Sequence, residues 1–218
     1  MKTRGRHLPF DILYEDGDII VIDKPAGILT AHTKVIGREA RESQWTVENL
    51  LTDYLRKGQA KSRKKAWLVH RLDRGTSGVM MIAKSEETAN WYRDNWRELT
   101  EKTYRLKVSG RMPASEGEYR SFLKDDDRTM KVRSVPDGAG GKLAVTRWRV
   151  VGETRTATDV EATLETGRKN QIRVQFADAG HPVVGDVKYG GKKADRLYLH
   201  AWRLKVKLRN GEWKTFTS

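Results

Sequence analysis

Hydrophobic and polar residues follow each other along the chain with periods that predict both strands and helices. Residues 18–24 form a short apolar run that is stopped by Pro25-Ala26-Gly27, which is typical of a buried strand. In residues 47–55 apolar side chains recur at helical spacing, and Thr46 stands where an N-cap is needed. Residues 79–84 predict a further strand.

The second half of the chain continues this alternation. Ser85 is expected to cap a helix that runs as far as Leu99, and a short helix is expected over residues 172–179, ended by Gly180. The polar, Gly-rich residues 110–142 are expected to form loops with short strands. Strand-like segments cover residues 102–108, 143–151, 157–166, 197–202, 204–208 and 213–216. The pattern predicts an α+β domain with a mixed, largely antiparallel sheet and flanking helices.

Composition narrows the class of protein. The 218 residues carry a formal net charge of +14 and contain no cysteine. Such a charge suits a polyanionic partner such as RNA, DNA or an anionic membrane surface. No apolar run approaches the roughly 20 residues that cross a bilayer. The absence of cysteine excludes disulfides, thiolate catalysis and Cys-ligated zinc, and favours a cytoplasmic protein. The length suits one large domain, or two small lobes around a shared core.

The segment 70–82, HRLDRGTSGVMMI, is the strongest candidate for chemistry. It places Asp73 between Arg71 and Arg74, ahead of a Gly-Thr-Ser-Gly turn and an apolar strand. Cations on both sides favour an ionised carboxylate, as a reactive group would need. The alternative is an ordinary surface ion pair, which such triplets also form.

Four segments in one order carry a resemblance to a known family. They are residues 23–27 (DKPAG), residues 70–82, residues 102–104 (KTY), and the pair 165–174 (ETGRKNQIRV) and 180–190 (GHPVVGDVKYG). Together they resemble the motifs of the RluA-type pseudouridine synthases. The resemblance implies the pseudouridine synthase fold with a central cleft, in a single catalytic domain over residues 1–218. It also leads us to expect no N-terminal S4 domain, because the first strand begins near residue 12.

The resemblance assigns roles to individual residues. Asp73 would act on the ribose, either by attacking C1′ or by removing a ribose proton. Tyr104 would stack on the base and take the C5 proton, and Arg173 would pair with Asp73. Arg71 would enter the space left by the flipped nucleotide. Substrate-binding roles are expected for Arg71, Arg74, Thr76, Lys24, Arg168 and Gln171.

Each of these roles has a plainer alternative. A tyrosine on a strand, such as Tyr104, is usually packing, and Arg173 could be a phosphate contact or a structural ion pair. The sequence also departs from the family at Asn170 and Gln175, where histidines are usual. These departures put RNA contacts or supporting hydrogen bonds in doubt.

The resulting prediction is an enzyme that converts a uridine of structured ribosomal or transfer RNA to pseudouridine, with no cofactor and no metal. Basic residues in 56–65, 188–196 and 203–209 would hold phosphates. We expect a monomer with no protein or membrane partner. A non-catalytic RNA-binding protein and a carboxylate-dependent glycosidase or nuclease are the alternatives.

Several further residues are expected to have no part in the chemistry. His7, His32 and His200 lack metal-ligand spacing. Residues 125–127, all Asp, are expected to form a solvated turn. The tryptophans Trp45, Trp67, Trp148 and Trp202 are expected in the core.

Overall fold

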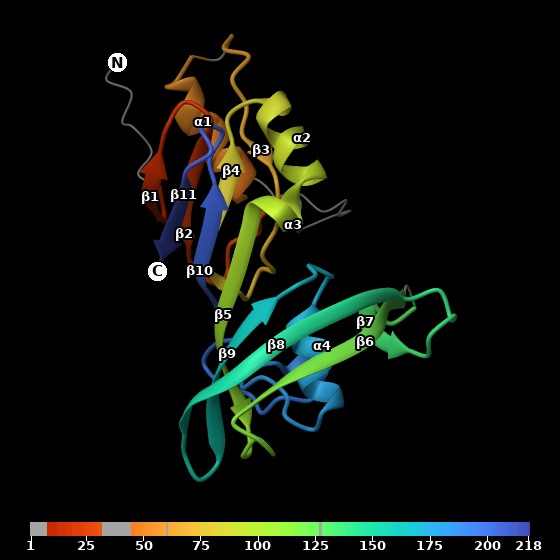
Figure 1. Cartoon of the computed structure of the whole chain (residues 1–218). Helices are drawn as coiled ribbons and strands as arrows, with labels where there is room; N and C mark the ends of the chain where they lie inside the picture. The colour runs from red at the N-terminus through yellow and green to blue at the C-terminus, as the bar shows by residue number, and fades with distance from the viewer. Residues whose placement is uncertain (1–7, 32–44, 60, 127) are drawn as a thin grey trace. The chain divides into compact units, whose positions relative to one another are not determined.

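The computed structural model describes residues 8–31, 45–59, 61–126 and 128–218 (Figure 1). His7, His32 and Asp127 lie outside this part of the chain. The chain divides into two compact units: unit 1 consists of residues 1–100 and 203–218, and unit 2 of residues 101–202. The boundary passes through two strands, β5 (Thr100–Ser109) and β10 (Leu199–Lys207). The expected single domain and its central cleft stay predictions.

Unit 1 is built on two strands that are buried almost throughout, β2 (Ile19–Lys24) and β4 (Ser77–Ala83). Their apolar runs lack alternation because both faces of each strand are covered. β2 pairs antiparallel with β4, and the order of strands is β1 (Asp11–Glu15), β2, β4 and β10. Two further strands, β3 (Trp67–Leu68) and β11 (Trp213–Thr217), pair with β4 and β10.

The helices of unit 1 begin where the sequence predicts. α1 (Val47–Arg56) is capped by Thr46, whose hydroxyl accepts from the amide of Asn49 at 3.1 Å. α2 (Glu86–Asp94) is capped in the same way by Ser85, which accepts from the amide of Thr88 at 3.1 Å.

The prediction of one helix as far as Leu99 is wrong, because α2 ends at Asp94, with Asn95 as its C-cap, and α3 (Trp96–Leu99) follows. The Asn95 side-chain amide donates to the Trp91 carbonyl at 2.8 Å, so it competes for a backbone group of the helix. Tyr92 and Leu99 still lie in the same hydrophobic core, together with residues of β2, β4 and β10.

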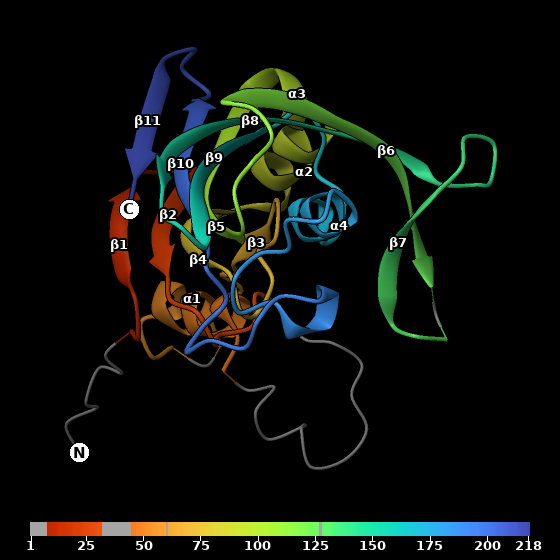
Figure 2. The same ribbon diagram turned by 90° about the horizontal axis from the view of Figure 1, so that it is seen from below.

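Unit 2 contains further antiparallel strands of the same sheet, together with one helix. From β5 the strand order continues through β9 (Ala157–Leu164), β8 (Lys142–Glu153), β6 (Glu116–Asp126) and β7 (Lys131–Val135). Figure 2 shows α4 (Gln171–Asp178) beside the β6–β7 hairpin, with which it is in contact. Phe176 of α4 packs edge-on against Tyr119, with the ring centroids 5.0 Å apart. The predicted α+β class with a largely antiparallel sheet is confirmed.

Three expectations about this part of the sequence are wrong. Residues 110–142 contain the long hairpin β6–β7, not mainly loops, because a strand with exposed side chains along much of its length reads as polar sequence. Within residues 197–208 there is one strand, β10 over Leu199–Lys207, rather than two, since Arg203 lies on its less buried face and does not interrupt it. Asp125 and Asp126 end β6, so the expected turn lies after them, where the Asp126 carboxylate accepts from the amides of Arg128 and Thr129. Among the tryptophans, Trp148 is buried, but Trp45 is 54% exposed.

Two glycines in the loop after α4 allow a test of close backbone packing. Both Gly185 and Gly190 have a positive φ, +84° and +85°, so alanine is strained at either position. A Cβ atom on Gly185 would also lie 1.8 Å from the Arg196 carbonyl oxygen, whereas a Cβ on Gly190 would meet nothing within 4 Å. We therefore expect Gly190→Ala to cost about 1 kcal/mol in unfolding free energy and Gly185→Ala more than about 4 kcal/mol. Urea denaturation of both variants measures this, and equal losses would contradict the packing seen here.

Candidate functional site

The segment that carries Asp73 is a loop whose backbone is fixed at several points. The Leu72 amide donates to the Thr30 hydroxyl at 3.2 Å, and that hydroxyl donates to the Leu72 carbonyl at 2.7 Å. The Thr76 amide donates to the Asp73 carbonyl at 3.1 Å, which closes the turn. Leu72 and Thr76 are buried, while Asp73 between them is half-buried. The loop therefore presents Asp73 from a backbone with little freedom.

Lys24 fixes this loop through hydrogen bonds to its backbone. Its side chain is completely buried, and its ammonium group donates to the carbonyls of Thr76 at 2.8 Å, Pro25 at 2.9 Å and Arg74 at 3.5 Å. Burial lowers the pKa of Lys24 to about 8, and the nearby negative charge of Asp73 opposes that shift. Lys24 thus positions the loop. Its burial does not favour the direct contact with substrate that the sequence led us to expect.

The two arginines beside Asp73 differ in their contacts. Arg74 is exposed, but its Nε donates to the Gly27 carbonyl at 3.0 Å, and the Gly27 amide donates to the Arg74 carbonyl at 2.7 Å. Arg74 therefore joins the loop to the turn after β2. Arg71 is exposed, which suits its expected role in contacting RNA.

In unit 2, Tyr104 lies on β5 and is only 7% exposed. It is opposite Ala162 of β9 in the strand register. Lys102 is two residues away and so belongs to the same face of β5. Burial lowers the pKa of Lys102 to about 8. The phenol of Tyr104 thus shares its strand face with a lysine that loses its proton more readily than an exposed one.

Arg173, on α4, is held by an acidic side chain that the sequence did not single out. Its Nε and one terminal nitrogen donate to the two carboxylate oxygens of Asp186 at 2.6 and 2.8 Å. The Asp186 side chain is 1% exposed and that of Arg173 is 13% exposed. A buried bidentate pair fixes the direction of the guanidinium. The expected pairing of Arg173 with Asp73 stays a prediction.

The two departures from the family motif occupy places in hydrogen-bond networks. Asn170 has a φ of 53° and donates to the Tyr189 hydroxyl at 2.9 Å, while it accepts from Arg173 at 3.2 Å. Gln175 is buried; it accepts from the Thr146 hydroxyl at 2.7 Å and donates to the Ala144 carbonyl at 3.0 Å. Asn170 therefore contacts Arg173 directly, whereas Gln175 attaches the same helix to β8.

Gln171 is the first residue of α4, and Arg168 lies in the turn that precedes this helix. The buried Gln171 side chain accepts from the Arg168 amide at 2.9 Å and from the Thr166 hydroxyl at 2.7 Å. Its amide nitrogen donates to the Val145 carbonyl at 3.0 Å. Arg168 in turn donates to the Leu143 carbonyl at 2.9 Å. These contacts attach the TGR turn to β8, and a direct RNA contact by either residue stays a prediction.

The expected site residues thus form two sets. Unit 1 brings together Lys24, Arg71, Asp73, Arg74 and Thr76, and unit 2 contains Tyr104, Arg168, Gln171 and Arg173. Sequence reasoning missed Thr30, Asp186 and Lys102. Asp186 and Lys102 stand inside the quoted segments 180–190 and 102–104, and that was the only signal for them in the sequence. Thr30 had none, because a single hydroxyl after a turn is common.

Two features of the described residues bear on other classes of function. Within the ranges that the structure describes, no three His, Asp or Glu side chains are grouped so that they could hold a metal ion. No helix in those same ranges is both long and apolar enough to cross a membrane.

Comparison with known proteins identifies the family. Residues 18–178 match the family model described as RNA pseudouridylate synthase, so the chain belongs to this family. It is 32% identical to the ribosomal large subunit pseudouridine synthase D of Salmonella typhimurium, over 94% of this chain and 65% of that protein. It is 33% identical to the protein of the same name from Escherichia coli K12, with the same coverage. The chain thus spans about two thirds of the length of these relatives.

Solved structures agree with the fold. The human RNA pseudouridylate synthase domain containing 4 superposes with a TM-score of 0.75 at 22% identity, covering 95% of this chain and 87% of that one. The human domain containing 1 gives a TM-score of 0.73 at 21% identity, covering 97% of this chain and 83% of that one. The expected pseudouridine synthase fold is confirmed.

The role of Lys24 can be tested through stability. Lys24→Met leaves three carbonyls without their donor, and we expect it to lower the unfolding free energy by about 2 kcal/mol at pH 7. Above pH 8 the folded wild-type chain has lost a proton that the unfolded chain keeps up to its ordinary pKa of 10.5, so stability rises with pH over this window. Lys24→Met has no lysine to titrate at this position, so its unfolding free energy does not show this rise with pH.

The difference in unfolding free energy between wild type and Lys24→Met should therefore grow by roughly 2 kcal/mol between pH 8 and pH 10. Urea melts across this range measure it, with the exposed Lys61→Met as control. A difference that stays constant between pH 8 and pH 10 would show that the pKa of Lys24 is not lowered.

Proposed function

We propose that this protein is an RNA pseudouridine synthase that isomerises a uridine of large-subunit ribosomal RNA. The observation that carries the proposal is the loop of Asp73: a half-buried carboxylate on a fixed backbone, beside the buried ammonium group of Lys24. Membership of the RNA pseudouridylate synthase family and the names of the relatives support the reaction and the class of RNA. Transfer RNA is a second candidate substrate, expected from sequence alone.

The reaction is an isomerisation within one nucleotide. The N1–C1′ bond breaks, the base turns, C5 bonds to C1′, the C5 proton leaves and N1 gains a proton. No electron or group from outside is needed. The target must first leave its stack, which costs a few kcal/mol and less where it is unpaired.

Each residue of the two sets has a part in this proposal. Asp73 acts on the ribose, and Lys24 holds its loop. Tyr104 stacks on the flipped base and takes the C5 proton, while Arg173, oriented by Asp186, supports the carboxylate. Arg71 occupies the gap left in the RNA, and Arg74, Thr76, Arg168 and Gln171 shape the surroundings of the nucleotide. A cytoplasmic location and a monomeric state are further predictions of the proposal.

Replacement of Asp73 by asparagine tests the reaction directly. Asp73→Asn keeps the shape of the side chain and removes its charge, so we expect product formation to fall by a factor of about 1000 or more while RNA affinity changes little. Pseudouridine in ribosomal RNA transcripts can be quantified by nucleoside analysis. The control is Asp53→Asn, which removes an exposed carboxylate on α1 and should leave the rate unchanged. Near-normal turnover by Asp73→Asn would exclude Asp73 as the reactive group.

Replacement of Tyr104 by phenylalanine separates stacking from proton transfer. The ring, worth roughly 1–3 kcal/mol in base stacking, is kept, so RNA binding should be retained. Loss of the hydroxyl should slow product formation by about 10²- to 10⁴-fold if it moves the C5 proton. Tyr198→Phe, which removes a hydroxyl that donates to Asp195, is the control. An unchanged rate of product formation in Tyr104→Phe would exclude the Tyr104 hydroxyl as the group that takes the C5 proton.

A further inference from the structure

The hairpin of β10 and β11 has one buried and one polar face. Leu204, Val206 and Phe216 are 2%, 0% and 7% exposed and belong to the core of unit 1. The intervening residues face the other way, because successive side chains of a strand alternate. On that side Lys207 is directly opposite Trp213 in the register, and Lys205 is opposite Thr215.

Trp213 is 42% exposed, although it is a large aromatic side chain. The Lys205 ammonium group lies 4.9 Å from the centroid of its ring, on the diagonal of the strand pair. Lys207 adds a second cation on the same face. We call Lys205, Lys207 and Trp213 the hairpin site. It combines an accessible π-surface with two ammonium groups.

The charges of the hairpin site contrast with the exposed sheet face of unit 2. There Arg105 and Arg149 each donate two hydrogen bonds to one carboxylate oxygen of Glu161, which is 6% exposed, so the carboxylate offsets one of the two positive charges. Within the described part of the chain, by contrast, no acidic side chain forms an ion pair with Lys207. The register partners on β11 are threonines and Trp213. Lys207 therefore keeps its positive charge at the surface of the hairpin site.

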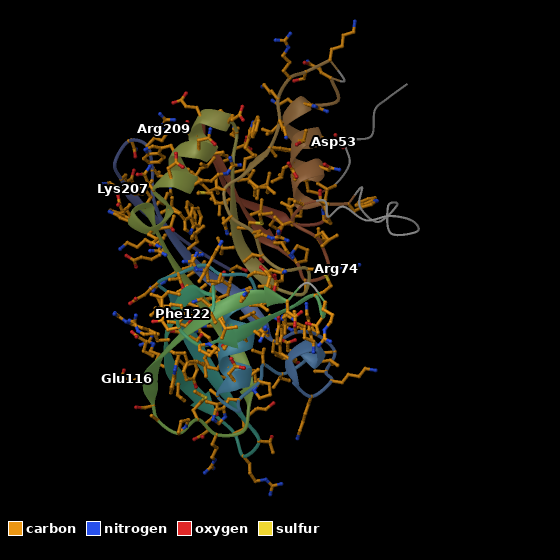
Figure 3. The ribbon with its side chains drawn as sticks, turned by 90° about the vertical axis from the view of Figure 1, so that its right-hand side faces the viewer. Asp53, Arg74, Glu116, Phe122, Lys207 and Arg209 are labelled. Carbon is orange, nitrogen blue, oxygen red and sulfur yellow. The ribbon has the colours of Figure 1, made fainter. Side chains whose placement is uncertain are left out.

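An exposed indole with adjacent ammonium groups suits a nucleotide. Every base has a π-face that can stack on an aromatic side chain, and ammonium groups attract the flanking phosphates. Figure 3 shows Lys207 and Arg74 on opposite sides of unit 1, so the hairpin site is separate from the loop of Asp73. A nucleotide bound here would not be the one that reacts.

We infer that Lys205, Lys207 and Trp213 form an accessory site that binds one unpaired nucleotide of the RNA substrate, with its base on Trp213 and its phosphates on the two lysines. The inference rests on the proposed function only in taking RNA as the partner. It adds affinity for RNA that carries a single-stranded segment at a distance from the target.

The stacking part is tested with two substitutions of one residue. Trp213→Leu keeps an apolar side chain and loses the π-face, whereas Trp213→Phe keeps a smaller π-face. With a short single-stranded oligouridylate we expect Trp213→Leu to weaken binding at least about fivefold and Trp213→Phe to bind nearly as wild type. A blunt RNA duplex of the same length should bind both variants alike. Equal losses for oligouridylate and duplex, or no loss at all, would overturn the inference.

The phosphate part is tested through salt dependence. Lys205→Gln with Lys207→Gln should lower the log–log salt slope for oligouridylate by about 1 to 1.5 units, as expected for two lost contacts. Lys142→Gln with Arg155→Gln removes the same charge from exposed positions of unit 2 and serves as control. If this control lowers the slope equally, affinity follows net charge alone and no site exists at the hairpin.

Activity separates this inference from the proposed function. Trp213→Leu should form pseudouridine at the wild-type rate when ribosomal RNA is saturating, since the hairpin site takes no part in the chemistry. If wild type forms no pseudouridine but Trp213→Leu still loses oligouridylate affinity, the site stands and the proposed function fails. If wild type is active and Trp213→Leu binds all RNA normally, only the accessory site is wrong.

Discussion

The buried ammonium group of Lys24 is the interaction on which the arrangement of unit 1 depends. Antiparallel pairing of β2 with β4 sets Lys24 opposite Gly78, directly after the loop that carries Asp73. Three backbone carbonyls surround the ammonium group, two of them from residues 74 and 76. A buried cation is costly unless its donors are all used, so this geometry ties the loop to the end of β2. The position of Asp73 thus follows from the pairing of two apolar strands.

Unit 2 positions its functional side chains by a different means. α4 is joined to β8 and β6 by buried amides, Gln171 and Gln175, whose polar atoms are matched by hydroxyls and carbonyls. Such networks specify one arrangement because any displacement would leave a buried polar group unsatisfied. Arg173 lies on this helix, and its guanidinium group is oriented by the ion pair with Asp186. Asn170 and Gln175 take part in these hydrogen bonds through amide groups, which carry no titratable proton.

Charge acts at two levels in this protein. The net charge of +14 supplies attraction to RNA that is independent of sequence. Many surface arginines, however, are engaged in pairs with acids, such as Arg147 with Glu118 and Glu165. The cations that remain available for phosphates are therefore fewer than the composition indicates. Their places on particular strands, rather than their number, would decide how an RNA is oriented.

The sequence by itself determined the class of fold, the caps of α1 and α2, the buried strands β2 and β4, and the family, because these depend on local periodicity and on short motifs. It could not show that residues 110–142 form a long hairpin, since an exposed strand lacks an apolar signature. Nor could it show that Asp186 pairs with Arg173 across 13 positions, or that Lys24 lies beneath residues 74–76. Those contacts join residues that are distant in the chain, and only tertiary packing decides which polar groups are buried together.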